Sequence, residues 1–161
     1  NVVAFPAIEN VPPDQKSFDV ITLFHVLEHL DDPGGYLKRL STCLAPDGQI
    51  VVEVPNIDDA LLTLYKSRAY SNFIYWSPHL FYFSEHTLTK LVSKVGLKLN
   101  YMKQVQRYPL SNHLYWLSHG EPGGHEQWDF LNDRGLTATY GNKLSEKGVS
   151  DTLFASVSRS A

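Results

Sequence analysis

Three polar residues with acid–base capacity follow one short apolar stretch, and they are the residues of this chain best suited to chemistry. His25, Glu28 and His29 come directly after the apolar residues 20–24. An imidazole titrates near neutral pH, so a histidine here is a candidate general base for a hydroxyl nucleophile. The alternative is structural, with Glu28 capping neighbouring amides and His29 bonded to a carbonyl. The pattern leaves both interpretations open.

The segments around these residues predict a β-α-β unit. Residues 20–24 and 50–54 are nearly unbroken apolar runs, as in parallel strands covered by helices on both faces. Between them, Asp32 is placed to cap a helix and Pro33 suits its first turn. The sequence Pro-Asp-Gly at 46–48 predicts a tight turn into the second strand. One face of the helix combines Tyr36, Leu37, Leu40 and Leu44.

The two predicted strands should deliver polar groups to one place. In an open α/β sheet, ligands bind outside the carboxyl ends of the strands. His25 follows the first run, and Asn56 follows the second. We therefore expect His25 and Asn56 to face a shared ligand cleft.

Composition narrows the function classes. The chain has 161 residues, 43% of them hydrophobic and 19% charged, which fits one globular domain. A net charge of −3 gives no electrostatic reason to expect nucleic acid. No apolar stretch approaches a membrane span, and Cys43 as the lone cysteine favours a reducing cytoplasm. Neither a zinc pattern of cysteine and histidine nor a Gly-x-Ser-x-Gly motif is present.

Four linked blocks resemble the second half of a class I S-adenosylmethionine (SAM)-dependent methyltransferase, over roughly residues 1–105. They are Phe-Asp-Val-Ile at 18–21, Val-Leu-Glu-His at 26–29, Leu-Ala-Pro-Asp-Gly at 44–48 and Val-Val-Glu-Val-Pro-Asn at 51–56. The resemblance implies an α/β fold, a partial Rossmann-like sheet, and SAM as cofactor. It also implies a glycine-rich loop and an acidic ribose ligand, which do not occur before Ser17. We therefore expect the C-terminal part of a methyltransferase domain, inactive by itself.

The resemblance also suggests which residues contact the cofactor and whether a metal binds. By its alignment Ala7, Ile8 and Glu9 are candidates to contact the adenine, although a plain connecting loop is the alternative. Phe24 and His25 are candidate cofactor contacts after the first clear strand, and a buried core phenylalanine is the alternative for Phe24. Related O-methyltransferases carry acidic residues and a histidine at this spacing. His25 replaces an acid there, so the sequence predicts no metal site.

An aromatic segment at 71–83 departs from regular periodicity. Its Pro-His-Leu-Phe-Tyr-Phe-Ser string at 78–84 resembles an element of methyltransferases that act on sugars and surface polysaccharides. That resemblance implies a catalytic role for His79, with Tyr75, Trp76 and Tyr82 near a substrate lid. The alternative is that His79 stabilises a buried aromatic cluster.

The remaining chain predicts helices at 58–70 and 84–94, and strands at 97–105 and 152–158, and residues 1–5 could end another strand. In the resembled family the last strand inserts into the sheet antiparallel to its neighbour. Residues of about 108–150 form an insertion with helices from Pro109 and over 136–147. His113 is a candidate acceptor contact there, and a packed helical cap is the alternative.

Together these patterns predict SAM-dependent methyl transfer to a small-molecule acceptor, with His25 or His79 as base. The resemblance suggests a sugar or polysaccharide precursor as that acceptor. Substrate contacts are expected from Glu28, His29, Asn56, Tyr75, Trp76, Tyr82 and His113. The alternative from another class is a non-catalytic binding module that forms a homodimer through an exposed sheet edge.

Overall fold

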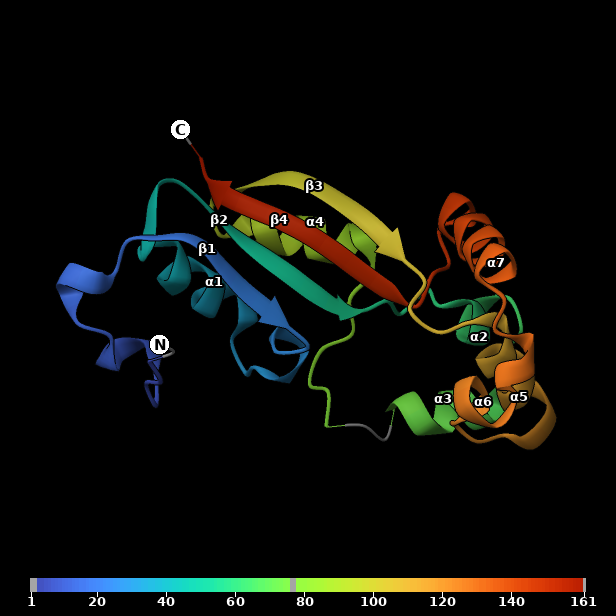
Figure 1. The fold of residues 1–161 in the computed structure, drawn as a ribbon. Coiled ribbons are helices and arrows are strands. Elements are labelled where there is room, and N and C mark those ends of the chain that lie inside the picture. Colours follow the sequence, from blue (N-terminus) through green and yellow to red (C-terminus); the bar gives the residue numbers. More distant parts are fainter. Residues whose placement is uncertain (1–2, 76–77, 161) are drawn as a thin grey trace.

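A sheet in the order β1-β2-β4-β3 forms the centre of the molecule (Figure 1). The computed structural model describes residues 3–75 and 78–160. The strands are β1 (Phe18–Phe24), β2 (Leu44–Pro55), β3 (Leu97–Val105) and β4 (Thr152–Arg159). β1 pairs parallel with β2, and β4 runs antiparallel to both β2 and β3. The expected insertion of the last strand into the sheet is confirmed, and β3 is an edge strand.

Helices α1 (Pro33–Ser41) and α4 (Glu85–Lys94) lie behind the sheet in Figure 1 and cover the same face. That face holds the core, in which Ile50, Val52 and Val54 of β2 pack with Leu153 and Ala155 of β4. The prediction of helices on both faces is wrong for the part of the chain that the structure describes. Val20 and Phe24 point to the other face and are about half exposed, at 51% and 50%.

The predicted β-α-β unit is confirmed, with two local corrections. Asp32 caps α1 by accepting a hydrogen bond from the Gly35 amide at 2.8 Å. The helix ends at Ser41, so Leu44 belongs to the strand and not to the helix face. The Pro-Asp-Gly sequence at 46–48 lies inside β2, where the register with β1 shifts between Phe18 and Val20. The expected turn is therefore an irregularity within the strand.

Local signals place α4 and β3 as predicted. Ser84 and Thr87 form a capping box, in which each side chain bonds the other residue's backbone amide. Gly96 follows α4 with a φ of 77°, a conformation that glycine adopts without steric cost. The strand that follows, Leu97–Val105, matches the predicted bounds.

The helix expected at 58–70 is interrupted. Asp59 caps the short α2 (Ala60–Thr63), Lys66 takes a positive φ of 52°, and α3 (Arg68–Tyr75) then begins. Part of the aromatic segment expected to be irregular is therefore helical. At the amino terminus, residues 3–5 form no strand, and Asn1 and Val2 lie outside the described residues. Three short 3-10 helices, η1 (Ile8–Asn10), η2 (Pro13–Gln15) and η3 (Leu27–His29), precede α1.

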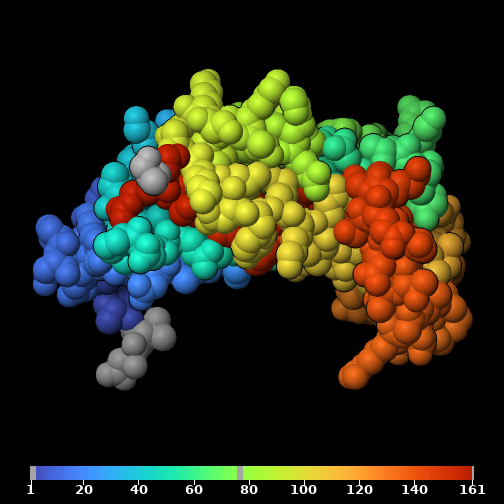
Figure 2. Space-filling view, turned by 90° about the horizontal axis from the view of Figure 1, so that it is seen from above, coloured from blue at the N-terminus to red at the C-terminus, as the bar shows by residue number. Residues whose placement is uncertain are grey.

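The predicted insertion is helical and gathers at one end of an elongated molecule, as Figure 2 shows. It contains α5 (Leu110–His119), α6 (Gly124–Gln127), η4 (Asp129–Leu131) and α7 (Arg134–Lys147). Gly120 and Gly123 carry positive φ values and turn the chain between α5 and α6. Among the described residues no helix combines the length and apolarity needed to cross a bilayer.

Candidate functional site

The carboxyl ends of β1 and β2 lie side by side, as the sequence predicts. Phe24 pairs with Glu53, and the His25 amide donates to the Glu53 carbonyl at 2.9 Å. β3 runs parallel to β1 and β2, and β4 runs antiparallel to all three. The end of β3 and the start of β4 therefore lie at the same edge of the sheet as the carboxyl ends of β1 and β2. Side chains from four strand ends therefore meet where an α/β sheet binds its ligands.

His25 is held at this edge between two carboxylates. Its φ of 54° is uncommon for a residue other than glycine and turns the chain sharply out of β1. The ring Nδ1 lies 3.3 Å from Glu28 Oε1, and Nε2 lies 3.0 Å from Glu53 Oε1. Arg107 forms an ion pair with Glu53 at 3.1 Å and also contacts His25 Nε2. Each ring nitrogen of His25 therefore faces a carboxylate.

Glu28 is a buried carboxylate without hydrogen bonds. The residue is 1% exposed, and within the described residues neither side-chain oxygen has a hydrogen-bond partner. His25 lies within ion-pair distance, but the contact does not have hydrogen-bond geometry. The structural prediction that the Glu28 side chain caps amides is therefore wrong. Its backbone carbonyl instead accepts bonds from the Leu80 and Phe81 amides, at 2.8 and 3.1 Å.

Two further histidines surround Glu28. His29 Nε2 lies 3.9 Å from Glu28 Oε1, and His79 Nε2 lies 4.0 Å from the same oxygen. The two rings are 4.8 Å apart between centroids. Nδ1 of His29 lies 3.3 Å from the Pro78 carbonyl, which confirms the predicted carbonyl contact. Burial lowers the pKa of His79, although the Glu28 charge opposes that shift. We call the set His25, Glu28, His29 and His79 the Glu28 cluster.

The aromatic segment borders the Glu28 cluster but forms no buried cluster of its own. Tyr75 is 53% exposed and packs edge-on against Tyr82, with ring centroids 5.2 Å apart. Tyr82 donates to the Ile74 carbonyl at 3.3 Å, and its ring centroid is 6.0 Å from that of His79. Trp76 lies outside the described residues. Among the described aromatic residues of 71–83, only Phe83 is buried, and it belongs to the main core.

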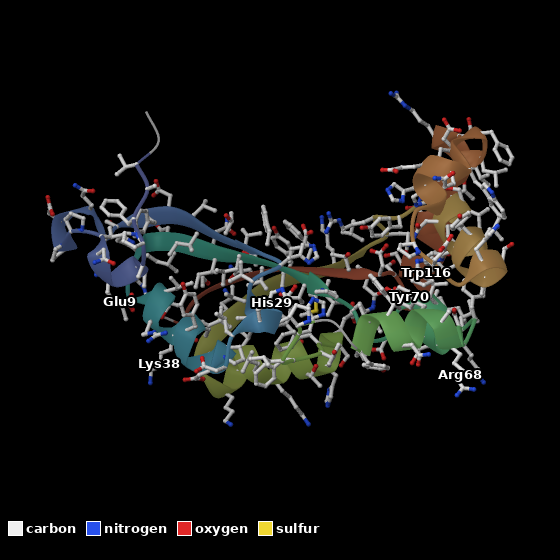
Figure 3. The ribbon with its side chains drawn as sticks, turned by 90° about the horizontal axis from the view of Figure 1, so that it is seen from below. Glu9, His29, Lys38, Arg68, Tyr70 and Trp116 are labelled. Carbon is white, nitrogen blue, oxygen red and sulfur yellow. The ribbon has the colours of Figure 1, made fainter. Side chains whose placement is uncertain are left out.

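A cavity of about 230 Å³ opens between the sheet edge and the insertion. His25, Pro55, Asp151 and Thr152 line it from the sheet, and Asp59, Leu61, Tyr70, Phe73 and Ile74 line it from α2, α3 and the preceding loop. The remaining lining comes from Arg107, Tyr108, Asn112, His113, Trp116, Pro122 and His125. The wall thus combines four tyrosine, phenylalanine or tryptophan rings with two carboxylates, one arginine and three histidines. Figure 3 shows Tyr70 and Trp116 side by side in this region.

The carboxylates of the cavity are fully hydrogen-bonded, unlike Glu28. Asp59 accepts from the Leu61 amide at 2.6 Å and from the Tyr70 hydroxyl at 2.8 Å. Asp151 accepts from the Arg107 and Tyr108 amides at 3.0 Å, and from the Gln106 side chain at 2.8 Å. We call the set Asp59, Tyr70, His113, Tyr140 and Asp151 the buried network.

Burial dominates the acid–base behaviour of the buried network. Desolvation raises the pKa of Asp59 to about 6, because its hydrogen bonds only partly offset the loss of water. It also raises the pKa of Asp151, and the pKa values of the Tyr70 and Tyr140 hydroxyls. His113 is 1% exposed, and burial lowers its pKa to about 4, so this ring is neutral at pH 7.

The other predicted site residues lie apart from the cavity. Asn56 is buried and donates to the Ser150 carbonyl at 2.8 Å, and it does not line the cavity. Phe24 is half exposed on the open sheet face, with its ring centroid 6.3 Å from that of Phe154. Ala7, Ile8 and Glu9 lie in or beside η1, near the amino end of β1. Figure 3 places Glu9 at the opposite end of the molecule from Tyr70 and Trp116, with His29 between them.

Sequence reasoning missed the polar partners supplied by other strands. Glu53 is the one charged residue in the apolar run of β2, and this interruption was a usable signal. Arg107 follows β3, and Asp151 precedes β4. In an antiparallel pair these two positions share an edge, so the predicted topology also implied that they meet.

The described residues fit part of a SAM site. Phe24 presents an apolar ring at the carboxyl end of β1, and Glu53, its pairing partner in β2, places a carboxylate at the same edge. An aromatic face and carboxylates suit a ligand that carries a positively charged sulfur. The described chain provides no glycine-rich turn after a strand for the remaining part of the cofactor.

Comparisons with known proteins agree with this fold. Residues 1–101 match the model of a family described as a methyltransferase domain. A SAM-dependent methyltransferase from Thermotoga maritima superposes with a TM-score of 0.53 at 21% identity, covering 94% of this chain and 60% of that one. The plantazolicin methyltransferase BamL, solved with S-adenosylhomocysteine, gives 0.50 at 13% identity, covering 92% and 55%.

A chain in the Haloferax volcanii complex of a methyltransferase with its Trm112 activator also matches, with a TM-score of 0.53 at 16% identity. That match covers 94% of this chain and 58% of the other. No curated protein matches the sequence. At these identities the structures establish the fold alone, and the chain spans less than two thirds of each of them.

Proposed function

The chain belongs to the methyltransferase domain family, and on that premise we propose that the intact protein transfers a methyl group from SAM to a small-molecule acceptor held in the cavity of this chain. The observation that supports this most is the position of His25. It leaves the carboxyl end of β1 with a positive φ, contacts two carboxylates, and lines the cavity beside Tyr70 and Trp116. Phe24, on the same strand end, is the proposed cofactor contact.

The chain's own residues supply alignment and a proton acceptor. When bound, SAM supplies an electrophilic methyl group on a positively charged sulfur. Aromatic walls at Tyr70, Tyr108 and Trp116 orient the acceptor, while His25 accepts the proton that a hydroxyl loses as it attacks. The Glu28 and Glu53 carboxylates, 3.3 and 3.0 Å from the two ring nitrogens, then stabilise the positive charge of the protonated ring. His79, predicted as an alternative base, faces Glu28 and does not line the cavity.

The acceptor that fits this cavity best is a sugar or a polysaccharide precursor. Aromatic rings offer apolar faces, and the Arg107, Asn112 and His125 side chains offer hydrogen bonds that fix orientation. A volume of about 230 Å³ accommodates one small ring. His113 takes part by holding the cavity wall through Tyr140, whose hydroxyl lies 2.6 Å from its Nδ1. A cytoplasmic location remains a prediction from the single cysteine.

The acceptor assignment is tested by truncating one wall of the cavity. Tyr108 is 44% exposed and lines the cavity, so Tyr108→Ala should leave folding intact while it removes a stacking surface. We expect KM for nucleotide-sugar acceptors to rise about 3- to 10-fold with kcat little changed, on the basis of aromatic contact energies. Leu117→Ala is the control, because Leu117 is exposed on α5 and does not line the cavity. Equal KM values for both variants would place the acceptor elsewhere.

The second candidate is a non-catalytic binding or dimerisation module. It is favoured by the edge position of β1, which pairs only with β2 among the described strands, and by the exposed Val20 and Phe24 nearby. Isothermal titration with SAM and sizing in solution separate the candidates. Stoichiometric SAM binding favours the enzyme, whereas a dimer without SAM binding favours the module.

A further inference from the structure

We propose that Glu28, His29 and His79 bind a divalent transition-metal ion of the zinc type. One ligand atom from each residue lies within 4.8 Å of the others. The ligands come from η3 and from the segment before α4, which the fold brings together. The inference does not depend on methyl transfer, because metal binding is measurable without cofactor or acceptor.

The unpartnered carboxylate of Glu28 is the strongest argument for a cation. Glu28 is 1% exposed, and both of its oxygens lack hydrogen bonds among the described residues. A buried carboxylate without partners costs several kcal/mol, so buried charges are normally paired or bound to metal. Nδ1 of His79 is likewise buried and without a partner. The described side chains therefore leave this carboxylate unsatisfied, and a metal ion would satisfy it.

The geometry is close to that of an open zinc site. Metal bonds of about 2.0–2.1 Å at tetrahedral angles separate ligand atoms by about 3.4 Å. The Glu28 oxygen lies 3.9 Å from His29 Nε2 and 4.0 Å from His79 Nε2, so small side-chain rotations complete the site. The Pro78 carbonyl contacts Nδ1 of His29 at 3.3 Å, which leaves Nε2 directed toward the ion.

The backbone already joins the two ligand segments. The Leu80 and Phe81 amides donate to the Glu28 carbonyl at 2.8 and 3.1 Å, next to His79 in sequence. Ligand positions are therefore set before an ion arrives. His25 is not part of the ligand set, and its Nδ1 lies 3.3 Å from Glu28 Oε1.

The donor set selects the kind of metal. Two imidazole nitrogens and one carboxylate are the protein ligands of many open zinc sites, whereas Mg²⁺ and Ca²⁺ prefer oxygen ligands. The sequence predicted no metal here, because His25 stands where the related O-methyltransferases have an acid. It gave no signal that His79, far along the chain, lies beside Glu28. A bound ion would occupy His79, which leaves His25 as the base of the proposed reaction.

The test is titration of the purified, chelator-treated protein with Zn²⁺ by calorimetry and with Co²⁺ by visible absorption. We expect one equivalent to bind, with tetrahedral Co²⁺ bands and a raised Tm in Zn²⁺. Glu28→Gln and His79→Ala should each weaken binding at least about 100-fold, since even outer-shell changes cost 10- to 100-fold. Their folding is checked by circular dichroism.

His86→Ala is the matched control, because His86 is an exposed histidine on α4 outside the cluster. It should bind both ions as the wild type does. Absence of binding by the wild type would overturn the proposal. So would affinity that is unchanged in Glu28→Gln and His79→Ala, or lost equally in His86→Ala. Methyl transfer plays no part in these readouts, so their failure leaves the proposed function untouched.

Discussion

The Glu28 cluster and the buried network both contain buried carboxylates, but these carboxylates differ in their hydrogen bonds. Asp59 and Asp151 accept hydrogen bonds from amides and side chains, whereas neither oxygen of Glu28 has a partner among the described residues. Satisfied polar groups rigidify a fold, and an unsatisfied one costs stability unless a ligand completes it. The contrast assigns structure to the buried network and chemistry to the Glu28 cluster.

The largest expected loss of stability on substitution is at Asp151. Asp151→Ala leaves the Arg107 and Tyr108 amides without their acceptor in a buried setting. We expect the free energy of unfolding to fall by about 3–5 kcal/mol, measured by urea denaturation. Asp129→Ala, at an exposed position in η4, should change it by less than about 0.5 kcal/mol. A loss below about 1 kcal/mol at Asp151 would remove the contrast.

Asp59 extends the comparison to the pH dependence of the unfolding free energy. Its pKa of about 6, raised by burial, means that the folded state holds the proton more tightly than the unfolded state. Stability is therefore lost as pH rises from about 4 to 6, by about 3 kcal/mol for about two pKa units. Asp59→Asn removes this loss. Its unfolding free energy relative to wild type should improve by about that amount between pH 4 and pH 7, and an unchanged difference would contradict the assignment.

The stability contribution of His113 should depend on pH in the opposite direction to that of Asp59. Burial lowers its pKa to about 4, so the folded state resists protonation. Its contribution is complete above the unfolded pKa of about 6.5 and is lost as pH falls toward 4, by about 3 kcal/mol. His113→Gln should abolish that acid-side loss in the same denaturation series. If Asp59→Asn and His113→Gln shift the pH dependence of stability in the same direction, the description of the buried network as desolvated is wrong.

The smallest expected effect is at Glu28 in metal-free protein. Because its oxygens make no hydrogen bonds, Glu28→Gln should lower the unfolding free energy by no more than about 1 kcal/mol. Glu28→Leu should be neutral or stabilising. Denaturation in the presence of chelator measures both. A cost near that of Asp151→Ala would mean that Glu28 is a structural residue like the others.

Local sequence signals determined most of the fold. Apolar runs located β1 and the core half of β2, and Ser84, Gly96 and Pro109 correctly predicted the ends of helices. Two failures share a cause, since apolar periodicity alone extended helices through Leu44 and through Lys66. At Leu44 strand pairing with Phe18 prevailed, and at Lys66 a positive φ ended the periodicity.

The candidate site was only partly predictable, because it depends on contacts between distant segments. His25 and Glu28 follow a recognisable strand, so their position was readable from the sequence. The contact of His79 with Glu28 required the path of the segment before α4, and that of Arg107 with Glu53 required the antiparallel placement of β3. Burial of Asp59 by α3 likewise has no local signature.

The central claim is that His25 accepts the acceptor's proton at the edge of the sheet. Transfer of a labelled methyl group from SAM to nucleotide-sugar acceptors tests it most directly, measured in the intact protein for wild type, His25→Ala and the exposed-position control His119→Ala. The account predicts that kcat falls about 10²- to 10⁴-fold in His25→Ala and is retained in His119→Ala. Turnover by a folded His25→Ala within about twofold of wild type would contradict it.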